Sequence, residues 1–316
     1  MPQKRTTLPV WKRPSGKYKA FVLAIKDHKN KNEFSCWNSI STKMIATGLV
    51  SKGYEVIPYF SEDVDKIPIS LETPVRGGAN SFQTVLKRLG IKLPNVDIPD
   101  FLWNSEEFIG RKIQVGTIKD LKRFKSFCGQ SKVHVKPYEI QKAFKGKVID
   151  LKELPNLLKS FSITQILKED YHLMKNFSDN FKLLMQEHIE IKNEIRFFVS
   201  NNSPTNEVEE QQNNFVVIPE FFSMQKHFFN ESETTTTQRN FVHKLAGYLR
   251  MNNFSMKNYV VDVAINAKTN QPCLVEINDP ITSGCGFITS EKEFTNIFLE
   301  RWFEITDDKL RKENKL

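Results

Sequence analysis

Three oxygen-bearing side chains, Asp262, Glu276 and Asn278, lie close together in the C-terminal part of the sequence. Alternate side chains of a strand share a face, so Glu276 and Asn278 point the same way if Leu274–Asn278 is extended. A symmetric hairpin centred near Thr269 then sets Asp262 opposite Glu276, with Cβ atoms about 5 Å apart. Facing carboxylates repel, and Mg²⁺, which prefers oxygen ligands, removes that repulsion. The spacing indicates a magnesium site, and the alternative is an outward polar face of a sheet.

A loop follows these residues directly and contains Asn278-Asp279-Pro280 and two glycines, Gly284 and Gly286. Such a loop lets the backbone come close to a phosphate or a substrate. It therefore favours the magnesium interpretation over the polar face.

A second group of candidate residues is basic. Lys136 ends a short strand predicted for Val133–Lys136, and three lysines follow in the next loop: Lys142, Lys145 and Lys147. Neighbouring ammonium groups repel each other unless water or an anion such as triphosphate separates them. A solvated basic loop and a phosphate site both fit this pattern.

A third group lies between the other two. Two predicted strands, Leu183–Ile191 and Asn193–Val199, are expected to pair through a turn at Lys192-Asn193. Glu194 and Arg196 share one face of the second strand, while its apolar residues face inward. They form either an ordinary surface ion pair or a carboxylate for ribose hydroxyls beside a guanidinium for phosphate.

The elements that position these residues fall into two regions. The first is α/β: strand Tyr18–Ile25, helix Ser39–Gly53 and strand Tyr54–Phe60 form a βαβ unit, which predicts a parallel sheet. A short helix, Ser81–Leu89, follows, and we place a boundary near Gly110.

The second region reads as α+β. Helices are expected at Leu154–Phe161, Asn240–Met251 and Glu291–Phe303, and strands at Tyr259–Ile265 and Cys273–Ile277. Asn201–Asn214 is expected to be a flexible polar loop, and the charged end Asp307–Leu316 to be frayed.

Composition limits the classes of protein that are possible. With 316 residues, 39% hydrophobic and 26% charged, the chain suits about two globular domains and not a disordered protein. The net charge is +9, and residues 1–31 hold nine Lys and Arg against one acidic residue. This basic arm is either a solvated tail or a segment that contacts phosphate, such as that of nucleic acid or a ribonucleoprotein.

Cysteines and apolar runs bear on the compartment. The four cysteines, Cys36, Cys128, Cys273 and Cys285, are too scattered for a paired zinc pattern. No secretory signal is recognisable, so free thiols in a reducing compartment are expected. The longest apolar run, Ala20–Ile25, is far short of the roughly 20 residues that span a bilayer. We expect a soluble cytoplasmic protein with no membrane partner.

The motifs, taken in order, resemble those of the ATP-grasp superfamily. The similarity is closest to the RimK-like ligases and to a divergent clade that includes a eukaryotic cell-division-cycle protein acting in translation-initiation-factor assembly. The matching stretches run from about Gly110 to Phe287: Val-Lys-Pro at 135–137, Gln-Glu-His-Ile at 186–189, Glu-Ile-Arg at 194–196, Asp262-Val263, and Val-Glu-Ile-Asn at 275–278. The resemblance implies α/β and α+β domains in an ATP-grasp fold. A basic arm and α/β domain (1–110) would precede an ATP-grasp domain (111–316) whose two α+β subdomains enclose the nucleotide.

The resemblance also implies roles for residues, with ATP and Mg²⁺ as cofactors. Lys136 would contact the nucleotide phosphates and Arg196 the phosphates or an acyl phosphate. Gln186, Glu187 and Ile189 would form the hinge that reads adenine, and Glu194 would bind the ribose. Asp262, Glu276 and Asn278 would bind magnesium.

The sequence departs from the family pattern in two places. The usual glycine-rich phosphate loop is missing, and Lys142 and Lys145 stand in its place. The earlier family lysine is represented by Lys112 or by its neighbour Arg111.

The implied activity is ATP-dependent ligation of a carboxylate to an amine through an acyl phosphate, with a protein or peptide among the candidate substrates. Two alternatives stay open. In the first, the protein binds ATP without turning it over and acts as an assembly chaperone for a partner protein. In the second, the basic arm makes the chain a nucleic-acid-binding module.

Overall fold

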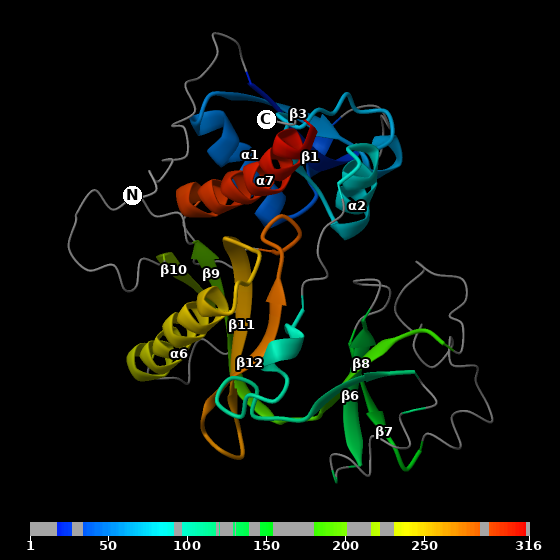
Figure 1. Cartoon of the computed structure of the whole chain (residues 1–316). Coiled ribbons are helices and arrows are strands. Elements are labelled where there is room, and N and C mark those ends of the chain that lie inside the picture. The colour runs from blue at the N-terminus through cyan, green and yellow to red at the C-terminus, as the bar shows by residue number, and fades with distance from the viewer. Residues whose placement is uncertain are drawn as a thin grey trace, which may run out of the picture.

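A computed structural model gives the fold of residues 18–26, 34–91, 97–117, 120, 129, 131–138, 146–153, 180–200, 216–221, 231–284 and 291–313 (Figure 1). These residues form three four-stranded sheets with helices packed on two of them. Three predicted segments lie outside the described residues: the helix Leu154–Phe161, the loop Asn201–Asn214 and the lysine pair Lys142 and Lys145.

The N-terminal layer is the predicted βαβ unit. Its elements are β1 (Tyr18–Lys26), β2 (Phe34–Trp37), α1 (Ile40–Ser51), β3 (Tyr54–Tyr59), β4 (Val75–Arg76) and α2 (Ala79–Arg88). β1 pairs in parallel with β3 and β4, which confirms the parallel sheet. The antiparallel edge strand β2 was not predicted. Ser39 caps α1 by accepting a hydrogen bond from the backbone of Thr42, and Gly53 ends the turn after it with φ of 84°.

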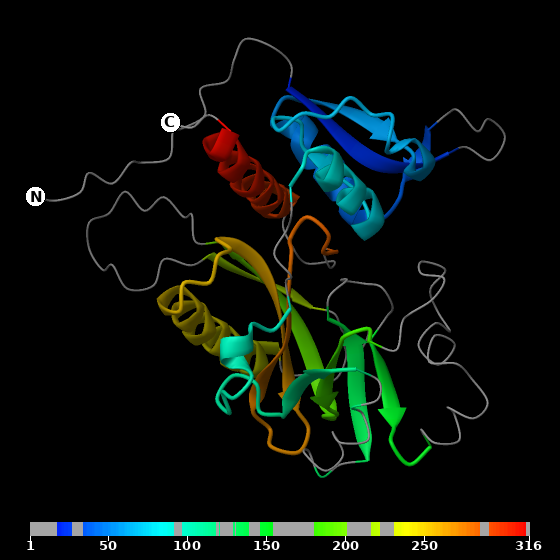
Figure 2. The same ribbon diagram turned by 45° about the vertical axis from the view of Figure 1, so that its right-hand side comes forward.

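The last helix, α7 (Glu291–Glu313), packs on this N-terminal layer and also contacts the central sheet, where the rings of Phe294 and Phe198 lie edge to face with centroids 5.3 Å apart. Figure 2 shows α7 lying alongside the first sheet. Phe294, Phe298 and Trp302 are fully buried there against α1 and α2 residues such as Ile45 and Phe82. The prediction of a helix ending at Phe303 with a frayed tail was wrong, because the helix continues to Glu313.

The central sheet has the order β10-β9-β11-β12 and is antiparallel throughout: β9 (Ile191–Ser200), β10 (Val216–Phe221), β11 (Asn258–Asn266) and β12 (Pro272–Asn278). Helix α6 (Glu231–Met251) covers one face, where Phe197 and Val261 pack against Leu245. The helix begins nine residues before the predicted start at Asn240, and in this added part buried Gln238 donates a hydrogen bond from Nε2 to the Val263 carbonyl (2.9 Å). The other face of the sheet carries polar side chains.

The third sheet has the order β5-β8-β6-β7: β5 (Ile113–Gly116), β6 (Lys132–Pro137), β7 (Lys147–Asp150) and β8 (Leu183–Glu187). The predicted hairpin of Leu183–Ile191 with Asn193–Val199 was wrong. β8 pairs with β5 and β6, whereas β9 pairs with β10 and β11, so residues 188–190 cross from one sheet to the other. Apolar alternation shows which face of a strand is buried, but it does not identify the partner strand.

Within the described part of the chain, every helix is too short or too polar to cross a bilayer. Cys273 is a free, buried thiol.

Candidate functional site

The β11–β12 hairpin brings the predicted oxygen ligands together. Asp262 lies directly opposite Glu276, as the hairpin spacing predicts. The next pair is Val263 with Leu274, so Val275 is an extra residue in β12 and forms a β-bulge. Leu274 and Ile277 both pack into the core under α6, which leaves Glu276 and Asn278 on the opposite, polar face.

Hydrogen bonds connect these side chains directly. The Asn278 amide donates from Nδ2 to Glu276 Oε1 (2.6 Å) and to Asp262 Oδ2 (3.1 Å). Arg196, opposite Asp262 on β9, donates from Nε and Nη2 to the two carboxylate oxygens of Asp262 at 2.7 and 2.8 Å. Asp262 is itself only 2% exposed, so this ion pair lies inside the protein.

Lys136 joins the cluster from the other sheet. Its ammonium donates to Glu276 Oε2 at 3.2 Å and lies 2.7 Å from Asp97 Oδ1. Lys136 belongs to β6 and Glu276 to β12, so their contact bridges the two C-terminal sheets. Asp97 was not predicted as a site residue, because it lies between prolines in a stretch with no motif or periodicity.

The cluster holds more negative than positive charge. Four carboxylates, Asp97, Glu194, Asp262 and Glu276, share the cluster with Lys136 and Arg196, and the nearby buried guanidinium of Arg111 adds a third positive charge. One net negative charge remains when all of these groups are ionised. Burial and the nearby charges of Asp262 and Glu276 raise the pKa of Glu194 to about 7. Burial raises the pKa of Asp262 to about 6 even though Arg196 opposes this shift. Burial acts in the same direction on Glu276, but Lys136 and Asn278 outweigh it and lower that pKa.

The donor set fits a divalent cation. The excess of negative charge favours a cation such as Mg²⁺, and the Asn278 amide nitrogen already bridges the carboxylates of Asp262 and Glu276 as a cation would. Rotating the amide by half a turn would present its oxygen in place of the nitrogen. Within the described residues, no three His, Cys, Asp or Glu side chains are placed to hold a metal ion together, and the donor set here consists of two carboxylates and the Asn278 amide.

The predicted hinge residues lie at the end of β8. Gln186 is buried, and its Oε1 accepts hydrogen bonds from Arg111 Nε and Nη2 at 2.9 and 2.7 Å. Glu187 pairs with Lys112 through their backbones, and Glu187 Oε2 accepts a hydrogen bond from the Lys112 backbone N–H at 3.2 Å. The Lys112 side chain is exposed.

Arg111 connects the hinge to the bulge in β12. Besides Gln186, its guanidinium donates to the carbonyls of Leu274 (2.5 Å) and Val275 (3.0 Å). Arg111 therefore holds β8 of one sheet against β12 of the other, close to the Lys136–Glu276 contact.

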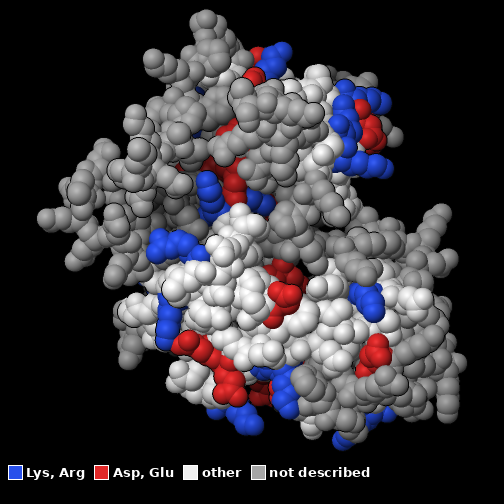
Figure 3. All heavy atoms as spheres, viewed as in Figure 1, with Lys and Arg blue, Asp and Glu red and all other residues white. Residues whose placement is uncertain are grey.

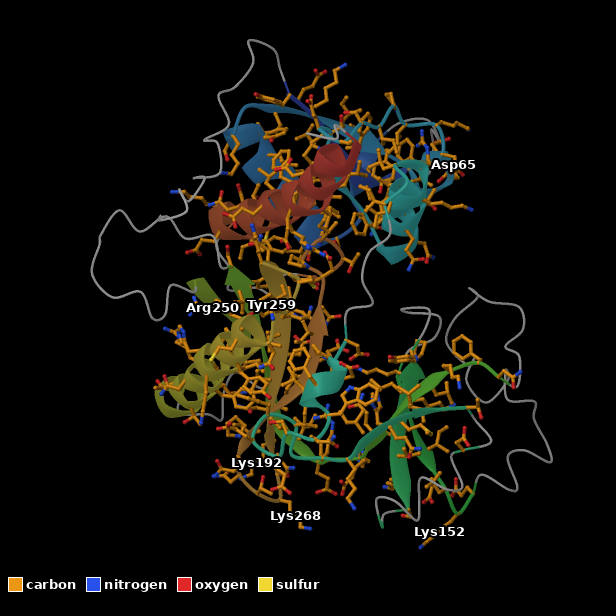
Figure 4. All side chains as sticks on the ribbon, in the orientation of Figure 1. Asp65, Lys152, Lys192, Arg250, Tyr259 and Lys268 are labelled. Atoms are coloured by element: carbon orange, nitrogen blue, oxygen red, sulfur yellow. The ribbon has the colours of Figure 1, made fainter. Side chains whose placement is uncertain are left out.

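A hollow of about 700 Å³ lies behind the hinge. Glu187 and Ile189 line it together with the β11–β12 turn, which includes Lys268. Lys192 and Lys268 mark this end of the central sheet in Figure 4, and Lys192 Nζ donates to Asn270 Oδ1 at 2.8 Å. The carboxylate cluster does not line this hollow, so the hinge and the cluster are separate parts of the candidate site.

The loop after β12 is held in place by the N-terminal layer. Arg76 of β4 donates to the carbonyls of Pro280 (3.2 Å), Ile281 and Ser283 (2.6 Å). Asp279 forms a buried ion pair with Arg301 of α7 at 2.9 Å. Arg196 Nη1 lies 3.4 Å from the Gly284 carbonyl, so the far end of this loop reaches the cluster.

Comparison with known families agrees with this arrangement. Residues 108–297 match an ATP-grasp domain family, the second family of a clade within that superfamily. This chain belongs to that ATP-grasp family. No curated protein matches it significantly.

Several solved structures resemble this ATP-grasp protein along most of its length. The RimK domain protein from Sphaerobacter thermophilus has 11% sequence identity and a TM-score of 0.48, and the match covers 92% of this chain and 98% of that chain. D-alanyl-alanine synthetase A from Vibrio cholerae has 11% identity and a TM-score of 0.49, with 92% and 99% covered. The D-alanine–D-alanine ligase from Bacillus anthracis complexed with ATP has 12% identity and a TM-score of 0.47, with 92% and 99% covered.

Membership of the family establishes the ATP-grasp fold of this protein, of mixed α/β and α+β type. ATP-grasp proteins bind ATP, and known members of the family are carboxylate–amine ligases. The family therefore places the protein in a class of ATP-binding ligases, and its substrates are a separate question.

Proposed function

We propose that this protein is an ATP-dependent carboxylate–amine ligase that binds Mg²⁺ and ATP where its two C-terminal sheets meet. The contact between Lys136 and Glu276 carries this proposal, because it brings a cation for phosphate and a carboxylate for metal together across the sheets. The excess of negative charge around it favours the entry of a divalent cation.

Each residue of the cluster has a proposed role. Asp262, Glu276 and Asn278 would hold Mg²⁺, which when bound neutralises charge on the phosphates. Lys136 and Arg196 would bind phosphate oxygens, since both already lie beside the proposed metal ligands. Glu194, on the same face of β9 as Arg196, would accept hydrogen bonds from the ribose hydroxyls. The backbone and side chains of residues 186–189 would contact adenine.

The proposed reaction has two steps. A carboxylate oxygen of the acid substrate bonds to the γ-phosphorus, and the bond from that phosphorus to the β–γ bridging oxygen breaks, which releases ADP. An amine then attacks the carbonyl carbon of the acyl phosphate, phosphate leaves, and the amine gives up a proton to solvent. The cations Lys136 and Arg196 would stabilise charge on the transferring phosphoryl group, and no covalent nucleophile is required.

The acid and the amine are not identified by the site. Three further points stay predictions. One substrate is a protein or peptide, the protein is cytoplasmic, and the basic arm contacts nucleic acid or a ribonucleoprotein. Most of that arm lies outside the described residues. On the face of the molecule in Figure 3, basic and acidic residues of the described part are intermingled and do not form one large basic surface.

The test is release of ADP by the full-length protein with Mg²⁺ and ATP, in the presence of panels of amines and carboxylic acids. We expect ADP release that depends on both an acid and an amine, and that is lost in Glu276→Gln. The control is Glu55→Gln, an exposed carboxylate on β3 far from the cluster. ATP binding without turnover for any pair would support the chaperone alternative, and absence of ATP binding would contradict both functions.

A further inference from the structure

Asp97 contacts the proposed site from outside the matched family domain. It precedes residues 108–297 in the chain, yet its Oδ1 lies 2.7 Å from the Lys136 ammonium. That distance is shorter than the 3.2 Å from the same nitrogen to Glu276 Oε2. Asp97 is therefore the nearer of the two anions that hold Lys136.

The segment that carries Asp97 is firmly anchored. Ile98 and Leu102, the neighbouring apolar residues, are buried in the core of the central sheet. Trp103 donates from Nε1 to the Ile98 carbonyl (2.9 Å), and its ring packs edge-on against Tyr138, directly after β6, at 6.3 Å between ring centroids. Asp97 Oδ1 also accepts the Ile98 N–H at 2.8 Å. Moving Asp97 away from Lys136 would thus require unpacking buried side chains.

The Lys136 ammonium needs such a fixed partner. Its side chain is only 9% exposed, so water cannot solvate the charge, and a buried charge without a partner is costly. Glu276, its other partner, is a proposed magnesium ligand. A carboxylate that binds a cation attracts a neighbouring ammonium less strongly, and Asp97 would then be the main anion that keeps Lys136 in place.

We propose that Asp97 is a positioning residue for ATP binding, which holds the Lys136 ammonium where the two sheets meet so that Lys136 can bind phosphate while Glu276 binds the cation. This inference rests on the proposed function. It assigns part of the nucleotide site to the segment that joins the N-terminal layer to the ATP-grasp domain.

The test compares four full-length proteins: wild type, Asp97→Asn, Lys136→Gln and the double variant. The affinity for ATP in the presence of Mg²⁺ is measured by calorimetry, and thermal unfolding checks that each protein is folded. We expect Asp97→Asn to bind ATP about ten-fold more weakly, because it replaces the ion pair with Lys136 by a weaker hydrogen bond to a neutral amide oxygen. In the Lys136→Gln background the same change should have no further effect.

A matched control lies on the same segment. Asp100 is exposed, and its carboxylate accepts a hydrogen bond from the Phe101 N–H. Asp100→Asn should bind ATP like the wild type. If Asp97→Asn does not fold, Asp97→Glu, which keeps the charge, takes its place. The inference is supported if Asp97→Glu lowers the affinity for ATP in the wild-type background and has no effect in the Lys136→Gln background.

Three results would overturn the inference. Wild-type or tighter ATP binding by Asp97→Asn would show that Asp97 does not assist Lys136. If Asp97→Asn lowers the affinity for ATP as much in the Lys136→Gln protein as in the wild type, its effect is structural and does not act through Lys136. If Lys136→Gln itself binds ATP normally, the proposed phosphate contact fails first, and that result is distinct from a failure of Asp97 alone.

Discussion

Arg196 binds both carboxylate oxygens of Asp262, with Nε–Oδ1 and Nη2–Oδ2 distances of 2.7 and 2.8 Å. Oδ2 also accepts the amide of Asn278 at 3.1 Å. Both oxygens that we propose as metal ligands are thus already hydrogen-bonded, and a cation has to compete with the guanidinium. Phosphate is a second bidentate partner for Arg196, so nucleotide and metal are expected to enter together.

This arrangement predicts that Mg²⁺ and ATP stabilise the protein jointly. Thermal unfolding should shift by less than about 1 °C with Mg²⁺ alone, and by several degrees with Mg²⁺ and ATP, because a ligand stabilises the folded state more as its concentration exceeds its Kd. A full shift with Mg²⁺ alone would show that Arg196 does not restrict access to Asp262.

Glu276→Gln should weaken Mg²⁺-dependent ATP binding at least ten-fold, since the variant loses the charge of a proposed metal ligand. The fold should persist, because Lys136 keeps its contact with Asp97. Calorimetry with and without Mg²⁺ measures the effect, and Glu55→Gln serves as the control. Unchanged affinity for ATP would refute the assignment of Glu276 to the metal.

Asn278→Asp tests the bridging amide. The change replaces a donor to two carboxylates with a third carboxylate, so the metal-free protein should lose about 1–3 kcal/mol of unfolding free energy. Added Mg²⁺ should restore more stability in this variant than in the wild type. Urea unfolding in EDTA and in Mg²⁺ gives both values, and identical responses to Mg²⁺ would rule out a cation between these side chains.

Glu194 should make the metal-free protein less stable as pH rises. Its pKa is raised from 4.5 in the unfolded chain to about 7 in the folded protein, so the folded state binds the proton more tightly. The unfolding free energy therefore falls between these two pH values and is constant above them. Glu194→Gln should remove the part of this dependence that comes from Glu194 and gain about 1–3 kcal/mol at pH 8. The part that comes from Asp262, whose pKa is raised to about 6, should remain. Urea unfolding in EDTA from pH 4 to pH 8 tests this, and parallel pH profiles for the two proteins would contradict it.

Arg111→Met should destabilise the protein by about 3–5 kcal/mol, because it leaves Gln186 and the carbonyls of Leu274 and Val275 without their buried donor. The matched control, Arg239→Met on the exposed side of α6, should change stability by about 0.5 kcal/mol or less. Urea unfolding measures both. A small effect at Arg111 would show that the two sheets are held together by other contacts.

Features that depend on short-range order along the chain could be predicted. The hairpin register of Asp262 and Glu276 follows from strand alternation and one short turn, and it holds even though a bulge at Val275 interrupts the pairing. The βαβ unit of the N-terminal layer was predictable for the same reason, since its apolar periodicity and its glycine signals are local. The order of the motifs also indicated the ATP-grasp fold.

Contacts between distant segments had to come from the folded chain. β8 and β9 look like a hairpin because a short polar turn separates two stretches rich in apolar residues, but apolar patterning does not specify a partner strand, and the two strands join different sheets. Lys136 and Glu276 are 140 residues apart and meet only because those sheets face each other. The pairing of Lys136 with Asp97 likewise depends on packing of Ile98 and Leu102, which no motif marks. Residue types and spacing thus defined the available chemistry, and long-range packing selected the partner of each charge.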